Sequence, residues 1–110
     1  TAAVQQFVHI GEHAFIAGGS LVRKNVPPYV KAAREPLSYV GVNTIGLRRR
    51  GFNDQQIINV EDIYRVIYVQ NSNMTTALAV ADLELPKSDE KYVVLDFIRN
   101  STNGIMRGLS

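Results

Sequence analysis

Residues 4–26, "VQQFVHIGEHAFIAGGSLVRKNV", decide the fold of the first part of this chain, because they repeat every six residues. The first position of the repeat is aliphatic, at Val4, Ile10, Ile16 and Val22. The position four residues later is small or β-branched, at Val8, Ala14, Ser20 and Val26. A fixed period of this kind is the sequence signature of a repeat architecture.

The repeat resembles the hexapeptide repeat of left-handed parallel β-helices. In those folds each hexad makes one short strand and a turn, and three hexads complete a triangular coil. The aliphatic residue points inward, and the residue four positions later has to be small to fit the corner. A lone coil cannot bury its own faces, because a repeat unit needs stacked neighbours. The sequence therefore predicts the terminal coil of a left-handed parallel β-helix over residues 1–30.

The segment "VPPYV" at residues 26–30 ends the repeat, because two prolines lack the N–H donors of an interior strand. Residues 31–42 are expected to be an irregular or extended connector. From residue 43 the apolar period becomes helical, so residues 43–110 are expected to form a small α-helical C-terminal domain.

Four helices are expected in that domain. Asn43 and Asn53 are suited to cap the first two, with Gln56 completing a capping box, and Gly51 is suited to end the first helix. Ser88 is suited to cap the fourth. The side chains expected to be buried in the last three helices are Ile57, Val60, Ile63, Tyr64 and Ile67; Met74, Ala77, Leu78, Ala81 and Leu85; and Val94, Leu95 and Ile98.

Composition narrows the function classes. The 110 residues include no cysteine, which excludes disulfides, thiolate metal sites and a cysteine nucleophile. No segment approaches the ~18 continuous apolar residues of a membrane span. Residues 1–50 carry a balance of +5 and residues 51–110 a balance of −3, so an anionic ligand or partner is expected on the first half. The basic residues are few and lack an aromatic-rich stacking motif, which argues against nucleic acid.

The stretch "HIGEH" at residues 9–13 fits the H-x-x-E-H pattern of a zinc protease. That pattern needs a helix, which would bring His9 and His13 onto one face. The six-residue register instead makes Ile10 an inward residue and Ala14 a corner residue. The two histidines therefore flank a hexad boundary, and we expect surface or cleft-edge histidines, with no metal.

Three motifs carry a family resemblance. "VQQFVHIGEHAFIAGGS" at 4–20, "VPPYV" at 26–30 and "GVNTIGLRRRGF" at 41–52 resemble the C-terminal portion of acyl-carrier-protein–UDP-N-acetylglucosamine O-acyltransferases. The tail "RNSTNGI" at 99–105 resembles the end of those chains. The resemblance implies a cytoplasmic homotrimer that moves a 3-hydroxyacyl chain from acyl carrier protein to the 3-hydroxyl of UDP-N-acetylglucosamine, the first step of lipid A biosynthesis. It implies a histidine as general base and no metal or other cofactor.

The resemblance covers the last two-fifths of such an enzyme, and its general-base histidine is expected upstream of Thr1. No catalytic residue is therefore assigned in this chain, which opens without methionine and is expected to start internally. Gln5 stands where relatives commonly have histidine, and glutamine cannot take a proton near neutral pH. Pro36 falls where some relatives have a histidine near the ligand.

The resemblance implies that Gln6, Asn43, Arg49 and Arg50 bind the nucleotide sugar. Arginine forks onto phosphate oxygens, and an amide both donates and accepts hydrogen bonds. The alternatives are a solvated basic turn for the arginines, an outward strand position for Gln6 and a helix cap for Asn43.

Gly18 matches a glycine that lines the acyl-chain groove, or is a glycine required by a tight corner. Four basic residues are expected to form a docking surface for acidic acyl carrier protein, or are ordinary surface charge: Arg23, Lys24, Lys31 and Arg34. The alternative function is a catalytically silent β-helix cap that serves in oligomerisation or in carrier-protein binding.

Overall fold

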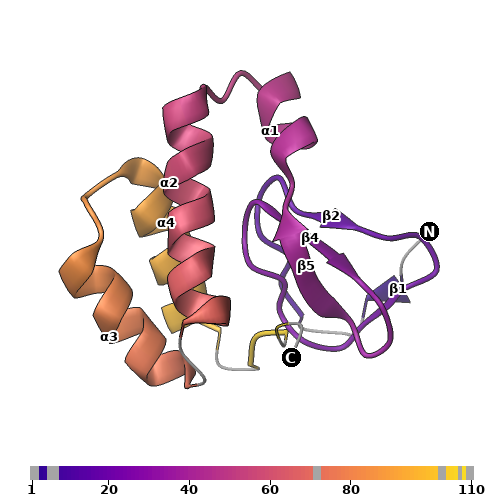
Figure 1. The fold of residues 1–110 in the computed structure, drawn as a ribbon. Helices are drawn as coiled ribbons and strands as arrows, with labels where there is room; N and C mark the ends of the chain where they lie inside the picture. Colours follow the sequence, from indigo (N-terminus) through magenta and orange to yellow (C-terminus); the bar gives the residue numbers. More distant parts are fainter. Residues whose placement is uncertain (1–2, 5–7, 71–72, 102–103, 107, 109–110) are drawn as a thin grey trace.

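The computed structural model describes residues 3–4, 8–70, 73–101, 104–106 and 108. A coil of short strands forms its first part, and helices packed beside the coil form its second part (Figure 1). The strands are β1 (Ala3–Val4), β2 (Phe15–Ile16), β3 (Leu21–Val22), β4 (Val30–Ala33) and β5 (Ser38–Val42). The helices are α1 (Thr44–Arg49), α2 (Asp54–Tyr64), the π-helical η1 (Arg65–Val69), α3 (Met74–Glu84) and α4 (Asp89–Arg99).

The strands of the coil pair in parallel at nearly constant spacing. β1 pairs with β3, with Val4 opposite Val22, so the chain returns to that face after 18 residues. β2 pairs with β4, with Phe15 opposite Lys31, a return after 16 residues. Stacked turns of short parallel strands are what the six-residue period predicted, and the repeat coil is confirmed at this level.

Burial of the inward aliphatic residues increases along the coil. Ile10 is 40% exposed, Ile16 is half-buried and Val22 is fully buried. Ile10 and Ile16 lie in the first turn of the described coil, which has a stacked neighbour on one side only, whereas Val22 begins the next turn. Gly11 lies where two turns approach closely, since a Cβ atom there would come 2.4 Å from the Pro28 nitrogen.

Residues 31–33 and 38–42 are extended and paired, and residues 34–37 form the turn between them. β4 and β5 form an antiparallel hairpin with Val30 opposite Val42 and a bulge between Lys31 and Ala32. Because β4 also pairs in parallel with β2, strand stacking continues past residue 30. The two prolines of "VPPYV" precede β4 and lie outside every strand, so they interrupt no ladder.

The helix caps expected from the sequence are confirmed. The side chain of Asn43 accepts from the Gly46 N–H, Asn53 and Gln56 form a capping box, and Ser88 caps α4. All of the stripe residues in α2, η1 and α4 are buried, whereas α3 buries Ala77 and Ala81 and leaves its larger side chains partly exposed. The π-helical segment η1 was not predicted.

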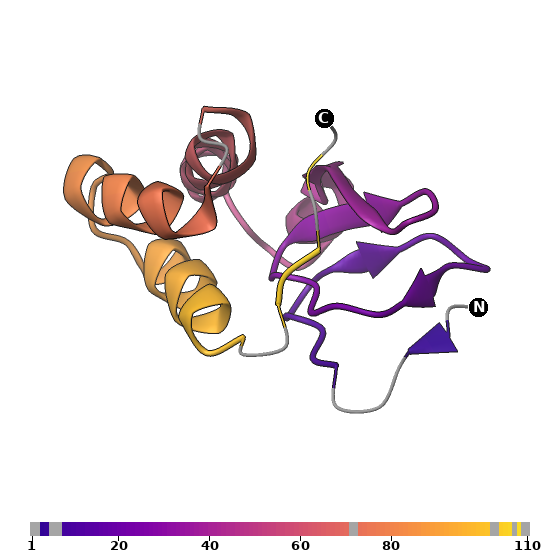
Figure 2. The same ribbon diagram turned by 90° about the horizontal axis from the view of Figure 1, so that it is seen from below.

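Tyrosines join the helices to the coil. The hydroxyl of Tyr64 donates to the Pro28 carbonyl at 2.6 Å, and that of Tyr68 donates to the Met106 carbonyl at 2.9 Å. Burial raises the pKa of both phenols. The C-terminal segment lies beside the coil, where the Met106 N–H donates to the Asn25 carbonyl at 3.0 Å (Figure 2).

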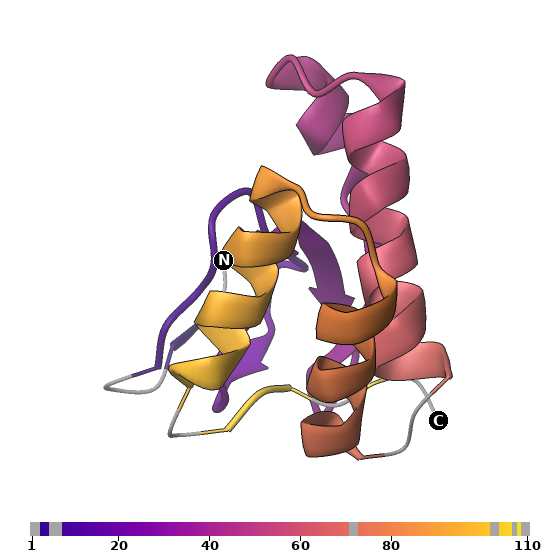
Figure 3. The same ribbon diagram turned by 90° about the vertical axis from the view of Figure 1, so that its left-hand side faces the viewer.

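Helix α3 lies next to η1, and α4 lies next to α2 (Figure 3). Within the described part of the chain, no helix is long and apolar enough to cross a membrane.

Candidate functional site

Helix α1 presents three consecutive arginines, residues 48–50, and ends in a Schellman motif. The Gly51 N–H donates to the Arg48 carbonyl at 3.1 Å, and the Phe52 N–H donates to the Leu47 carbonyl at 3.0 Å. Gly51 has a φ of 90°, a conformation that glycine adopts without steric cost. The predicted end of the helix at Gly51 is confirmed, and it directly follows the third arginine.

The three arginines have different surroundings. The guanidinium of Arg48 forms an ion pair with Asp54 at 2.6 Å. Arg49 and Arg50 are exposed, and neither forms an ion pair or a side-chain hydrogen bond with another described residue. Successive residues of a helix point in different directions, so only one of the three reaches Asp54. Arg49 and Arg50 thus keep donors available for an anion.

Asn43 ties the start of α1 to the coil. Its N–H donates to the Tyr29 carbonyl at 2.8 Å, and its Nδ2 donates to the His13 carbonyl at 3.1 Å. Its Oδ1 accepts from the Gly46 N–H at 3.2 Å. The amide is therefore committed at both ends, with one N–H and one lone pair left for another partner.

Three rings, which we name the aromatic corner, pack where α1 meets the coil. His13 and Tyr29 are stacked with centroids 6.0 Å apart, and Phe52 meets them edge-on at 5.5 and 5.6 Å. The hydroxyl of Tyr29 donates to Oε1 of Glu12 at 3.2 Å. Burial first, and then the Glu12 charge, raise the pKa of Tyr29.

His13 and Tyr29 occupy the same corner of successive turns. They are 16 residues apart, the spacing by which Phe15 pairs with Lys31. Both have a positive φ, 57° and 70°, which is uncommon for residues other than glycine. This corner was not predicted from the sequence, although two rings one turn of the coil apart are a signal for it.

The "HIGEH" stretch at residues 9–13 is not helical, so the helical geometry of the zinc-protease pattern is not formed. The His9 N–H donates to Oδ1 of Asn25 at 2.8 Å, while His13 belongs to the aromatic corner. No three metal-ligating side chains gather within the described segments.

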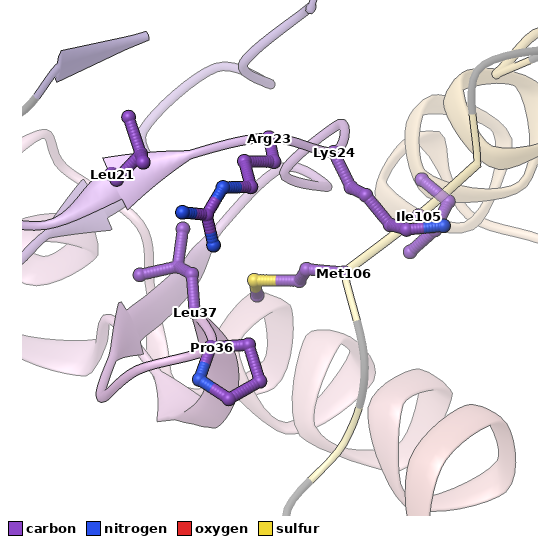
Figure 4. Close-up of a pocket in the computed structure, with 7 residues that line it drawn as sticks. All are labelled: Leu21, Arg23, Lys24, Pro36, Leu37, Ile105 and Met106. Atoms are coloured by element: carbon purple, nitrogen blue, oxygen red, sulfur yellow. The ribbon is translucent and has the colours of Figure 1, made fainter. Parts of the chain in front are cut away.

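A pocket of about 330 Å³ lies on another side of the coil. Its lining combines buried Leu37 and Met106 with exposed Arg23 and Lys24, and the Arg23 guanidinium pairs with Glu35 at 3.0 Å. The lining residues come from β3, from the segments after β3 and between β4 and β5, and from the C-terminal segment (Figure 4). They are Leu21, Arg23, Lys24, Pro36, Leu37, Ile105 and Met106.

The structure brings together only some of the predicted residues. Of the four residues predicted to contact carrier protein, Arg23 and Lys24 share the pocket. Lys31 is exposed on β4, and Arg34 is exposed beyond the end of β4, with a φ of 78°. The other two carrier-contact residues are therefore not among the described lining residues of this pocket.

Three predicted positions concern the coil itself. Gly18 lies in the exposed turn between β2 and β3, outside the described lining of the pocket. Gln5 and Gln6 lie outside the described residues.

The chain matches one family model and several known sequences. The family model described as "Udp N-acetylglucosamine O-acyltransferase; Domain 2" matches residues 25–106. The acyl-[acyl-carrier-protein]–UDP-N-acetylglucosamine O-acyltransferase of Myxococcus xanthus is 37% identical over 106 residues, covering 96% of this chain and 41% of that protein. The protein of the same name from Halorhodospira halophila is 36% identical over 104 residues, covering 94% of this chain and 40% of its own length. The chain thus spans about two-fifths of these curated relatives.

Solved structures resemble the fold closely. A UDP-N-acetylglucosamine acyltransferase from Bacteroides fragilis superposes with a TM-score of 0.93 at 44% identity, covering 96% of this chain and 42% of that one. The enzyme from Francisella novicida gives a TM-score of 0.85 at 33% identity, with coverage of 96% and 39%.

Proposed function

The chain belongs to the UDP-N-acetylglucosamine O-acyltransferase family, and on this basis we propose that it is part of an enzyme that acylates UDP-N-acetylglucosamine. In this proposal a 3-hydroxyacyl chain moves from acyl carrier protein to the sugar 3-hydroxyl, as the first step of lipid A biosynthesis. The observation that carries the proposal is the family match over residues 25–106, supported by relatives whose names state that acceptor and donor.

The proposed assembly is a cytoplasmic homotrimer built on left-handed parallel β-helices. The coil over residues 1–30, the connector over 31–42 and the helical domain over 43–110 would be its terminal part. The parallel pairings at 16- and 18-residue spacing support this proposal, because three hexads complete one turn of such a helix. The general-base histidine is expected before Thr1, and the chemistry proposed here needs no cofactor.

Arg49 and Arg50 are the proposed phosphate-binding residues. Their guanidinium groups are exposed at the end of α1, and Arg48 beside them is engaged by Asp54. A guanidinium presents several N–H donors in a plane, which matches the oxygens of a diphosphate. Gln6 and Asn43 are proposed to contact the same nucleotide sugar.

The acyl chain and its carrier are proposed to meet the coil. The size of the side chain at position 18 would limit the acyl chain that fits the groove, and Gly18 leaves that space open. Arg23, Lys24, Lys31 and Arg34 would attract an acidic carrier protein, and the basic excess of residues 1–50 supports this.

Replacing Arg50 tests the phosphate role. In the natural full-length protein, Arg50→Ala should raise the KM for UDP-N-acetylglucosamine roughly ten- to one-hundred-fold, the equivalent of losing a charge-assisted bond worth ~1.5–3 kcal/mol. Arg48→Ala is the matched control, because the same residue type is removed from a side chain already paired with Asp54. Steady-state kinetics with both substrates varied supply the measurement. An unchanged KM for each substrate in Arg50→Ala would remove Arg50 from the site.

A further inference from the structure

We propose that the aromatic corner (His13, Tyr29 and Phe52) is a positioning device that holds Arg49 and Arg50 in place for their anionic ligand. The inference rests on the proposed function, since it assumes that these arginines bind phosphate. It adds positioning residues that contact no ligand themselves and act through the orientation of α1.

Helix α1 cannot orient itself. It has six residues, and so short a helix is unstable in water without tertiary contacts. Its only buried side chain is Leu47. One buried side chain holds the helix at a single point, so its direction depends on the contacts at its two ends.

Both ends of α1 are fixed to the same two residues of the coil. At the start, Asn43 donates to the carbonyls of His13 and Tyr29 at 3.1 and 2.8 Å. After the end, the ring of Phe52 packs against the rings of His13 and Tyr29 at 5.5 and 5.6 Å. The arginines lie between these two attachments, at residues 48–50, so any movement of the Phe52 anchor moves them directly.

The coil residues that receive these contacts are themselves held firmly. Tyr29 is 3% exposed, its N–H donates to the Glu12 carbonyl at 2.9 Å, and its hydroxyl donates to the Glu12 carboxylate at 3.2 Å. His13 and Tyr29 both keep a positive φ, which persists in non-glycine residues only where surrounding contacts impose it. Such residues cluster at functional sites. The corner is therefore a rigid base, and Phe52 is the contact through which that base acts on the arginines.

Phe52→Leu is the variant that separates positioning from stability. Leucine keeps an apolar side chain that can still pack but removes the ring contacts, which are worth about 0.5–1.5 kcal/mol per pair. We expect the affinity of the natural full-length protein for UDP-N-acetylglucosamine to fall about three- to tenfold, with the KM for the acyl donor unchanged. Phe52→Tyr keeps the ring and should bind as the unaltered protein does.

Tyr39→Leu is the matched control. Tyr39 is also part of a ring stack, 4.6 Å from Tyr68, and is partly buried, but its ring makes no contact with the aromatic corner. Removing that ring should leave the affinity for the nucleotide sugar within about twofold of the original. Titration calorimetry with UDP-N-acetylglucosamine measures the affinity of each variant, and steady-state kinetics measure the KM for the acyl donor.

A double-mutant cycle tests whether Phe52 acts through Arg50. In an Arg50→Ala background, Phe52→Leu should lose most of its effect on affinity, because the group that it positions is absent. An undiminished effect in that background would overturn the inference. So would equal losses of affinity in Phe52→Leu and Tyr39→Leu.

Amide hydrogen exchange gives a readout that needs no ligand. Exchange across residues 44–50 should be faster in Phe52→Leu and unchanged in Tyr39→Leu, and equal exchange in both would refute the positioning role. If the unaltered protein fails to bind UDP-N-acetylglucosamine, the proposed function fails. If Arg50→Ala weakens binding and Phe52→Leu does not, only the present inference fails.

Discussion

Asn43→Asp tests the attachment of α1 to the coil, because it alters one end of the side chain and preserves the other. Aspartate keeps an oxygen that can accept from the Gly46 N–H, so the helix cap survives. It replaces the Nδ2 donor, now 3.1 Å from the His13 carbonyl, by a second carboxylate oxygen. Two acceptors then face each other across a partly buried contact.

The magnitude follows from these contacts. Removing the donor leaves the His13 carbonyl unsatisfied, which costs about 1–3 kcal/mol when that group is buried. A negative charge at the start of a helix returns about 0.3–1 kcal/mol. Because the site is only partly buried, we expect a net loss of about 0.5–2 kcal/mol in the free energy of unfolding.

Asn73→Asp supplies the control. Asn73 caps α3 by accepting from the Thr76 N–H at 3.1 Å, is exposed, and has no described partner for its Nδ2. The same substitution there should leave stability unchanged or raise it by about 0.3–1 kcal/mol. Urea unfolding followed by far-ultraviolet circular dichroism, without ligand, measures both variants. Equal changes at Asn43 and Asn73, within about 0.5 kcal/mol, would refute the attachment.

Two further predictions concern stability. The buried Lys91 donates to two carbonyls at the end of α3, at 2.9 and 3.0 Å. Lys91→Met should therefore cost about 2–4 kcal/mol in urea unfolding, and Lys87→Met, at an exposed position, close to nothing. Burial raises the pKa of Tyr64, so near pH 10 the unfolded chain loses the phenolic proton while the folded chain keeps it. The free energy of unfolding therefore falls as the pH rises above about 10, by up to ~1.4 kcal/mol per pH unit from this group. Tyr64→Phe should remove this contribution to the alkaline slope. At neutral pH it should cost about 1–3 kcal/mol, because the buried Pro28 carbonyl loses its donor. An unchanged slope in a pH series of urea unfolding curves would contradict this prediction.

Part of the candidate site could be predicted from the sequence. Asn43 and Gly51 mark the start and end of α1 because capping depends on residues only three or four positions away. The arginine run between them is visible in the same stretch. The sequence pattern does not show that Arg48, and neither of the next two arginines, forms the ion pair with Asp54. This depends on where Asp54 lies after the turn at Gly51.

The repeat register and the helix boundaries were determined by the sequence alone, because both are local: inward positions recur every six residues, and each cap and its acceptor belong to one turn. Tertiary structure decided the rest. The pairing of β4 with β5, the π-helical segment η1 and the approach of Met106 to Asn25 join residues far apart in the chain or depend on what packs against them. The aromatic corner is the clearest case. His13, Tyr29 and Phe52 carry no motif, and they meet only because the coil returns to one corner after 16 residues and α1 turns back across it.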